Sequence, residues 1–449
     1  MDIILAGGGD IGTAAAEMLT SRGHSVTVID IDDTRLTYLE EHLDIAVLEG
    51  SASSGATLRR AGAATADAVI ATTDVDEVNL VICDIAASLG AHRTLARVDH
   101  SMFLQDEELD YASIFSVDQL FSPDRAMASA MAARLRNPAA IAVEHFAGSD
   151  IELQQIEVAP RAQAIGTPLR KLGLPKGARL AAITRNGQAF LPVADTAVEP
   201  EDIVTLVAEQ ASFPAARRFF TKDPFGRRSI AINGAPAAAV WLCRFLGSRD
   251  FDIRLFEQDL NRAEVIGEKL DHITVLHADP AQPEVFDDEH LERADAFVSM
   301  RSDEKNMLAC AYARRCGVKT VMPVVRHPEF LPLMRELGLE QTWNPRRSAV
   351  QAINRVLHCH EFERIEGFFK GTLDLMRVRV GAGAPLEGKT LMELDREPPL
   401  LVLASEDDEG RPCVPDGTMR VTAGRHMIVL TTTAEADAVC RLLATGNGR

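Results

Sequence analysis

The fold of this chain is decided by IILAGGGDIG at residues 3–12, where four apolar residues run into a G-x-G-x-x-G loop. An apolar run followed by such a loop predicts a buried strand, a tight turn and a helix. Gly7 permits the turn, Gly9 lets backbone N–H groups approach a pyrophosphate, and Gly12 allows the helix to pack closely on the strand. We therefore expect a nucleotide-binding loop whose helix offers free N–H groups to phosphate.

An acidic residue follows the next apolar run. Residues Ser25 to Ile29 predict the second strand, which leads into Asp30, 23 residues after Gly7. A carboxylate at this position accepts hydrogen bonds from the ribose hydroxyls and repels a 2′-phosphate. The pattern favours NAD or an adenosine di- or triphosphate over NADP.

The chain also repeats itself at about half its length. Asp76-Glu77-Val78-Asn79 recurs as Asp303-Glu304-Lys305-Asn306, 227 residues later. The G-x-x-L-x-x-L segment at 166–172 recurs at 388–394. A repeat that holds its register over this distance indicates two copies of one composite unit.

Within each copy, buried strands first alternate with helices and then give way to short strands. The strands expected in the first copy are Ile3–Ala6, Ser25–Ile29, Ala46–Leu48, Ala68–Ala71, Thr94–Val98 and Ile114–Ser116. Apolar strands separated by helices predict a parallel sheet covered on both faces. Short strands with an Asn186-Gly187 hairpin signal follow from residue 151. The expected fold class is α/β, with two Rossmann-like parallel-sheet domains, each followed by a small α+β domain.

This organisation predicts four domains. The Rossmann-like domains are expected at residues 1–122 and 228–356, and the small α+β domains at residues 140–222 and 366–449.

Composition excludes several classes of protein. The net charge is −19, which argues against a nucleic-acid binder and against adhesion to anionic lipid. The longest stretch without a charged residue, Ser229–Cys243, is shorter than the roughly 20 apolar residues of a spanning helix. The start of the chain shows no signal peptide, and seven scattered cysteines suggest reduced thiols. We expect a soluble intracellular protein.

Further candidates lie at the carboxyl edge of the first sheet. Ser51 follows the third strand, and Thr73 follows the fourth, at the start of a helix where capping is the alternative role. Arg97, near the end of the fifth strand, could meet a phosphate, although a surface ion pair is the alternative there. All three positions border the crevice where ligands bind in such sheets.

No catalytic constellation accompanies the fold. None of the three tyrosines is followed four residues later by a lysine, so the Tyr-x-x-x-Lys pair of short-chain dehydrogenases is absent. His358-Cys359-His360 has no second pair that would complete a metal site, and a helix end is the simpler interpretation. We expect neither catalytic nor metal-binding residues.

Together, the module order, the glycine loop, the distant Asp and the D-E-x-N repeat resemble the TrkA family. This family comprises cytosolic regulatory subunits of bacterial Trk potassium uptake systems and carries RCK domains, also called KTN domains. The resemblance implies a homotetrameric ring that binds NAD(H) or ATP/ADP and gates a TrkH- or TrkG-like membrane subunit from the cytoplasmic face of the inner membrane. The nucleotide contacts that it implies fall on Gly7, Gly9, Asp10, Ile11, Gly12, Asp30, Ser51 and Thr73.

The second copy departs from this pattern. Asn233 is expected at the first glycine position and Ala235 at the second, while Pro236 lacks the N–H group of a phosphate cradle. Glu257 stands opposite Asp30 and could still accept a ribose. We expect one nucleotide per chain, bound in the first copy. The apolar segment Ala126–Ala133 predicts a surface that a homo-oligomer, most simply a tetramer, would bury.

Two other interpretations stay open from the sequence. In the first, the protein is an NAD-dependent oxidoreductase whose small domains bind substrate. In the second, it is a ligand-sensing RCK module of another transporter or channel, because no motif identifies the partner surface.

Overall fold

The computed structural model describes residues 1–106, 108–136, 140–145, 151–209, 211–221, 227–248, 250–339, 341–357, 362–365, 369, 372–394, 399–406 and 411–443. The chain forms two compact units. Residues 1–136 and 225–357 make up the first unit, which holds both parallel sheets, and residues 137–224 and 358–449 make up the second, which holds both small modules.

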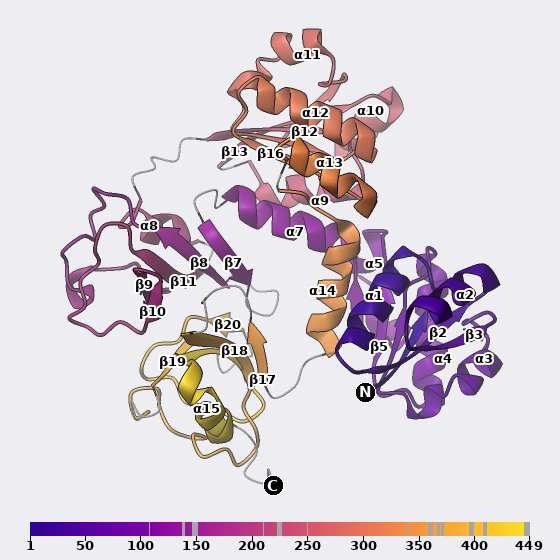
Figure 1. Cartoon of the computed structure of the whole chain (residues 1–449), viewed down its shortest axis with the longest axis horizontal. Coiled ribbons are helices and arrows are strands. Elements are labelled where there is room, and N and C mark those ends of the chain that lie inside the picture. Colours follow the sequence, from indigo (N-terminus) through magenta and orange to yellow (C-terminus); the bar gives the residue numbers. More distant parts are fainter. Residues whose placement is uncertain are drawn as a thin grey trace. The chain divides into compact units, whose positions relative to one another are not determined.

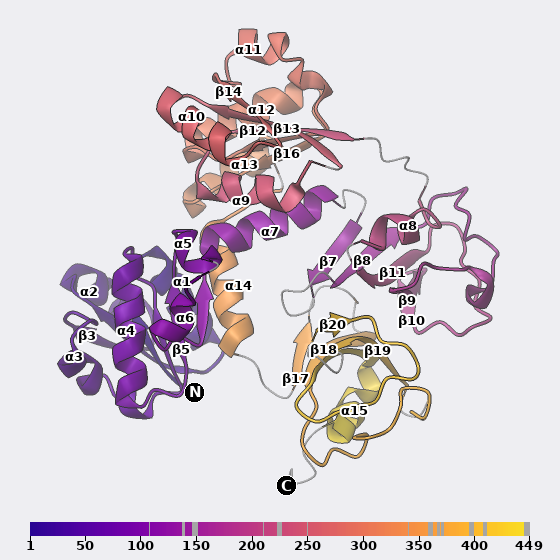
Figure 2. The same cartoon turned by 180° about the vertical axis from the view of Figure 1, so that it is seen from behind.

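The first Rossmann-like domain has a six-stranded parallel sheet in the order β3-β2-β1-β4-β5-β6. Its strands are β1 (Asp2–Ala6), β2 (Ser25–Asp30), β3 (Ala46–Glu49), β4 (Ala68–Ala71), β5 (Thr94–Arg97) and β6 (Gln119–Phe121). Its helices are α1 (Asp10–Ser21), α2 (Asp33–His42), α3 (Gly55–Arg60), α4 (Asp76–Leu89), α5 (Met102–Gln105) and α6 (Tyr111–Ile114) (Figures 1 and 2). The strand order reverses beside β1, so a crevice is expected where the carboxyl ends of β1 and β4 diverge.

The sixth strand lies later in the chain than the sequence indicated. The prediction of a strand at Ile114–Ser116 is wrong, because Ile114 ends helix α6 and β6 begins at Gln119. The Asp110 carboxylate caps α6 by accepting from the backbone N–H of Ser113 at 3.3 Å. An acidic cap therefore turns a short apolar run into one turn of helix.

The second Rossmann-like domain repeats the arrangement with a five-stranded parallel sheet in the order β14-β13-β12-β15-β16. Its strands are β12 (Arg228–Asn233), β13 (Phe251–Glu257), β14 (Thr274–His277), β15 (Ala296–Ser299) and β16 (Thr320–Pro323). Its helices are α9 (Ala237–Leu246), α10 (Leu260–Lys269), α11 (Pro283–Asp288), α12 (Asp303–Arg315) and α13 (Leu331–Glu336). An isolated bridge between Val324 and Trp343 stands where the first copy has its sixth strand.

The helices that leave the two domains are exchanged between them. Helix α7 (Pro123–Arg136) leaves the first domain and lies against α9 of the second (Figures 1 and 2). Its buried Met127 and Met131 pack in the core of the second domain with Trp241. The cluster that holds them also contains Ala128, Ala132, Leu135, Ile232, Leu242 and Leu255.

Helix α14 (Pro345–Leu357) makes the reciprocal exchange. It leaves the second domain, and Ala349, Ile353 and Leu357 pack in the core of the first domain beside α1 and β6. Arg93 of the first domain donates to the carbonyl oxygen of Val356 at 3.2 Å, which holds the end of this helix.

The exchange removes one argument for oligomerisation. The apolar side of Ala126–Ala133 was expected to lie open to another chain. Within this chain, Met127, Ala128, Met131 and Ala132 are at most 1% exposed because the second domain covers them. The inference from that segment is therefore wrong.

The second unit contains two antiparallel sheets, in the orders β10-β9-β11-β8-β7 and β17-β18-β21-β19-β20. The first module consists of β7 (Ala140–His145), β8 (Ile151–Glu157), β9 (Ala178–Arg185), β10 (Gln188–Phe190), β11 (Ile203–Glu209) and α8 (Phe213–Arg217). The second consists of β17 (Phe362–Ile365), β18 (Leu373–Arg379), β19 (Leu400–Glu406), β20 (Pro412–Cys413), β21 (His426–Thr432) and α15 (Ala436–Leu443). Leu153 and Ala182 of the first module share one buried cluster with Leu375 and Leu403 of the second. The predicted fold class, α/β with two small α+β modules, is confirmed.

Among the described helices, none is both long enough and apolar enough to span a membrane.

Candidate functional site: the loop at the carboxyl edge of the first sheet

The turn after β1 can be built only with glycine at two positions. Gly7 has φ +111°, a conformation that L side chains rarely adopt. A Cβ on Gly12 would lie 1.8 Å from the carbonyl oxygen of Gly7. Helix α1 therefore packs directly on the turn, and its first residues lie at the crevice.

Gly9, in contrast, is not required by the backbone geometry of the turn. It is the residue before α1, with φ −68° and ψ −168°, a conformation open to any residue. A Cβ there would have one neighbour within 4 Å, the Arg35 Nη1 at 3.8 Å. The fold does not need this glycine, so its absent side chain leaves open space beside the start of α1. The first N–H groups of a helix have no partner within the helix, and Gly9 has no side chain to cap them. Space and donors together fit a phosphate.

Asp30, at the end of β2, lies directly against this loop. Its side chain is nearly buried, and its carboxylate accepts from the backbone N–H of Gly8 at 2.5 Å and of Asp32 at 2.9 Å. An ionised carboxylate has about four acceptor positions, so two backbone bonds leave capacity for ribose hydroxyls. Ser51 follows β3 on the same edge, is exposed, and has its Oγ 2.8 Å from that of Ser53.

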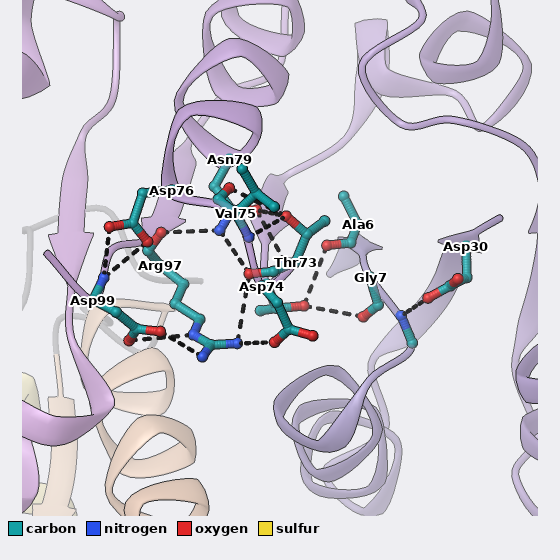
Figure 3. Close-up of polar contacts among 12 residues, drawn as sticks. Ala6, Gly7, Asp30, Thr73, Asp74, Val75, Asp76, Asn79, Arg97 and Asp99 are labelled. Atoms are coloured by element: carbon teal, nitrogen blue, oxygen red, sulfur yellow. Dashed lines mark hydrogen bonds and ion pairs between the residues drawn. The ribbon is translucent and has the colours of Figure 1, made fainter. Parts of the chain in front are cut away.

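The D-E-x-N segment fixes the loop after β4 (Figure 3). The Asn79 amide is fully buried; it donates to the carbonyl oxygens of Thr73 at 2.9 Å and Arg97 at 3.0 Å. Its Oδ1 accepts from the backbone N–H and the hydroxyl of Thr73, at 2.9 and 2.7 Å. Asp76 accepts from the N–H groups of Asp99 and His100. These side chains join the loop to the end of β5, whereas Val75 is the N-cap residue of α4 and makes no side-chain cap.

Arg97 is held by carboxylates of the protein itself (Figure 3). Its guanidinium lies 2.8 Å from Asp74 and 2.6 Å from Asp99, and 15% of its side chain is exposed. Burial acts to lower the pKa of Arg97, but the hydrogen bond and charge of Asp99, and then those of Asp74, raise it on balance. To bind a phosphate, this side chain would have to share its donors with both carboxylates.

Two arginines near the loop were not identified from the sequence. Arg35 lies near Gly9. The sequence feature that could have revealed it is a basic residue in the first turn of α2, five residues after Asp30. Arg346 donates from Nε to the carbonyl oxygen of Asp10 at 2.6 Å. No local pattern could have shown that contact, because 336 residues separate the two.

In the second copy, the turn glycine is one residue later than predicted. Gly234 has φ +88° and donates to the carbonyl oxygen of Phe256, as Gly7 donates to Ile29. The assignment of Asn233 to the first glycine position and Ala235 to the second is therefore wrong by one residue. The neighbouring Asn233 was a plausible substitute because Asn tolerates the left-handed conformation.

With the corrected register, residues other than glycine stand in the second copy where the first copy has glycine. Ala235 takes the place of Gly8 and donates to Glu257, at 3.2 Å. Pro236 precedes α9 as Gly9 precedes α1, and it offers no N–H group. Ala239 occupies the position of Gly12, where the first copy has no room for a Cβ.

Protein groups also crowd this second loop. A Cβ on Gly234 would lie 2.7 Å from Cγ of Arg301, whose guanidinium donates to Gln258 at 2.6 Å. On α7, the Asp124 carboxylate lies within reach of the backbone N–H of Ala238, in the first turn of α9. Burial, and then the charge of Asp99, raises the pKa of Asp124. When ionised, this carboxylate repels a phosphate.

Within the described residues, no group of three or more His, Cys, Asp or Glu side chains is placed to hold a metal ion. The segment His358–His360 lies outside the described residues.

The fold and the first loop define a class of protein: a tandem of Rossmann-like domains, each paired with a small α+β module. Solved structures share this architecture: a crystal structure of the GsuK RCK domain superposes with a TM-score of 0.60 at 17% identity, covering 98% of this chain and 94% of that one. A GsuK channel bound to NAD gives a TM-score of 0.61 at 16% identity, covering 98% of this chain and 78% of that one. At these identities the likeness concerns the fold.

Family models define the protein more narrowly. The TrkA-N domain model matches residues 3–123 and 230–345, and the TrkA-C domain model matches residues 153–221 and 375–444. The chain belongs to the TrkA family, which confirms the predicted resemblance.

Relatives agree with this assignment. The Trk system potassium uptake protein TrkA of Haemophilus influenzae is 29% identical over 359 residues, covering 79% of this chain and 78% of that protein. A TrkA homolog of Archaeoglobus fulgidus is 27% identical over 366 residues, covering 81% and 83%.

Proposed function

We propose that this protein is the regulatory subunit of a Trk-type potassium uptake system and that it binds one NAD(H) or ATP/ADP per chain in the first copy. The observation that carries the nucleotide site is Gly9. The fold does not require a glycine there, yet its missing side chain opens the space beside the unpaired N–H groups of α1. Binding of a phosphate explains why residue 9 is a glycine, whereas the geometry of the turn alone does not require one.

The proposed contacts follow from this placement. Backbone groups from Gly7 to Gly12, including those of Asp10 and Ile11, hold the phosphates, and Asp30 accepts the ribose. Ser51, Thr73 and Arg97 line the same sheet edge and complete the proposed set. The four domain boundaries predicted from the sequence stay predictions.

The partners are proposed from the family. The relatives named above are potassium uptake proteins, which supports a TrkH- or TrkG-like membrane subunit as the partner and no reaction of the protein's own. We propose a homotetramer on the cytoplasmic face of the inner membrane, without insertion into it. A nucleotide controls such an assembly only if it binds one conformation better than another.

The test uses Gly9→Ala in the full chain. The new methyl group has room in the fold, so the thermal unfolding midpoint should stay near that of the wild type. We expect calorimetric titration with ADP or NADH to show at least a tenfold loss of affinity, because the methyl group occupies the space of the phosphate. Gly267→Ala is the matched control, since a Cβ there, on α10, meets nothing within 4 Å. Wild-type affinity in folded Gly9→Ala would contradict the proposed site.

A further inference from the structure

Helix α14 of the second copy begins beside the nucleotide loop of the first. Ala349 and Ile353 anchor it in the core of the first domain, each less than 1% exposed. One turn earlier, Arg346 donates from Nε to the carbonyl oxygen of Asp10, at 2.6 Å. Because Asp10 is the first residue of α1, this contact brings a guanidinium to the end of the helix that faces the proposed phosphate.

The bonding of Arg346 leaves the N–H groups of both its Nη atoms available. A guanidinium has five N–H groups, and the contact with Asp10 uses the one on Nε. Within the described part of the chain, no carboxylate forms an ion pair with Arg346, in contrast to Arg97 with its two. The planar fork of an arginine matches the geometry of a phosphate.

A second basic side chain of the second copy lies within electrostatic reach of the same loop. His327 has its Nδ1 2.8 Å from Asp303, and this hydrogen bond and charge raise the pKa of the imidazole. The charge of Asp10 acts on it in the same direction, which places Asp10 within electrostatic reach of His327. Positive charge from the second copy thus offsets the one acidic side chain of the loop.

The two exchanged helices bring opposite charges to the two loops. Pro123-Asp124 opens α7 and Pro345-Arg346 opens α14, so the acid and the base occupy the same position of the repeat. Asp124 reaches the degenerate loop at Ala238, while Arg346 reaches the intact loop at Asp10. Each charge suits its loop, because only the intact loop keeps the space and donors for a phosphate.

We propose that Arg346 is a phosphate-binding residue of the nucleotide site, so that the site is built jointly by the loop of the first copy and the first turn of the exit helix of the second. The inference rests on the proposed function and deepens it. A bound pyrophosphate then contacts α14 directly. Nucleotide binding in the first copy therefore affects the helix that leaves the second Rossmann-like domain.

The experiment compares Arg346→Gln with Arg347→Gln in the full chain. Arg347 is the exposed neighbour on the same helix, so the matched control makes the same change of charge one residue away. We expect Arg346→Gln to weaken ADP and NADH about tenfold to a hundredfold, the range for a hydrogen bond between charged groups. Arg347→Gln should stay within about twofold, the scale of an exposed charge. Adenosine, which has no phosphate, should bind the wild type and Arg346→Gln equally.

Each outcome separates the two proposals. If the wild type binds neither ADP nor NADH, the proposed function fails. If the wild type binds and Arg346→Gln matches it, or weakens adenosine and ADP by the same factor, the role of Arg346 is refuted and the loop site stands. If Arg346→Gln fails to fold, nucleotide affinity is measured for Arg346→Lys instead. A lysine keeps the charge but lacks the planar guanidinium and its Nε hydrogen bond to Asp10.

Discussion

The three glycines of the G-x-G-x-x-G motif, Gly7, Gly9 and Gly12, are present for different physical reasons. Gly7 is fixed by its φ of +111° and Gly12 by a carbonyl oxygen 1.8 Å from where its Cβ would be. Gly9 alone has an ordinary conformation and open space beside it. Two glycines therefore serve the fold, while the third is explained by a ligand.

Asp30 and Glu257 provide a matched pair for testing the ribose contact. Asp30→Asn keeps one acceptor for the backbone but removes the charge. We expect NAD affinity to fall by about 1.5–3 kcal/mol, the scale of a charge-assisted hydrogen bond. NADP should gain relative to NAD, because the repulsion of a 2′-phosphate is relieved. Calorimetric titration measures both.

Glu257→Gln is the control for that measurement. It makes the same change at the equivalent position of the second copy, where Ala235 donates to the carboxylate. Its nucleotide affinity should equal that of the wild type. If both variants lose affinity equally, the assignment of the ribose to Asp30 is wrong.

His327 predicts a pH dependence of stability. The hydrogen bond and charge of Asp303 raise the pKa of His327 in the folded protein. A raised folded pKa means that the stabilisation is complete below the unfolded value of about 6.5 and is lost as pH rises through the folded pKa. We expect His327→Gln to lower the urea midpoint at pH 6 and to match the wild type at pH 9. A difference of the same size at both pH values would rule out this ion pair as its source.

At the scale of elements, the D-E-x-N repeat has a structural explanation. Asn306 repeats the bonds of Asn79: it donates to the carbonyl oxygens of Arg301 and Val324, and its Oδ1 accepts from the N–H of Arg301. Asp303 accepts from two N–H groups after β16, as Asp76 does after β5. Both copies keep these residues because they join two strand ends, whether or not the copy binds a ligand.

The sequence could predict features that depend on residues close together in the chain, but not those that depend on residues far apart in it. Strand and helix alternation, the glycine turn and the position of Asp30 are local patterns, and they predicted the sheet and the first loop. The sixth strand was misplaced because a single cap at Asp110 outweighed an apolar run. The helix exchange and Arg346 depend on contacts more than a hundred residues apart, which leave no periodic trace.

The exchange of helices predicts that two core mutations act on the opposite domain. Ile353 is buried in the first domain although its helix leaves the second. Ile353→Ala should cost about 2–5 kcal/mol of unfolding free energy and should speed amide exchange in residues 3–28. Met131→Ala, buried in the second domain, should speed exchange in residues 230–257. The prediction fails if each variant loosens the domain that precedes its own helix.

On the scale of the whole molecule, the two copies have diverged in charge at equivalent positions. Asp99 of the first copy corresponds to Arg326 of the second, as their matching bonds to Asp76 and Asp303 show. Arg301 stands where the first copy has the uncharged Thr73, as the matching bonds of Asn79 and Asn306 show. The charge of Arg326 acts on Asp124, the acid that reaches the second loop. Such a difference in charge favours contact between the first and the second Rossmann-like domain of one chain.

Assembly must then use other surfaces. Val81 on α4 and Leu308 on α12 occupy equivalent positions of the two copies and are 40% and 66% exposed. We expect a homotetramer by light scattering, four times the 48.8 kDa chain mass. Val81→Glu with Leu308→Glu should lower that mass by placing charge in an apolar contact. A monomeric wild type at micromolar concentration would contradict the ring.

The proposed asymmetry assigns nucleotide binding to the first copy and leaves the second as structure that carries an arginine to the site. The stoichiometry of ADP binding to the wild-type chain, measured by calorimetric titration, tests it most directly. We predict one ADP per chain, because Pro236 lacks the N–H group and Asp124 places a carboxylate at the second loop. Two equivalent sites per chain would contradict it.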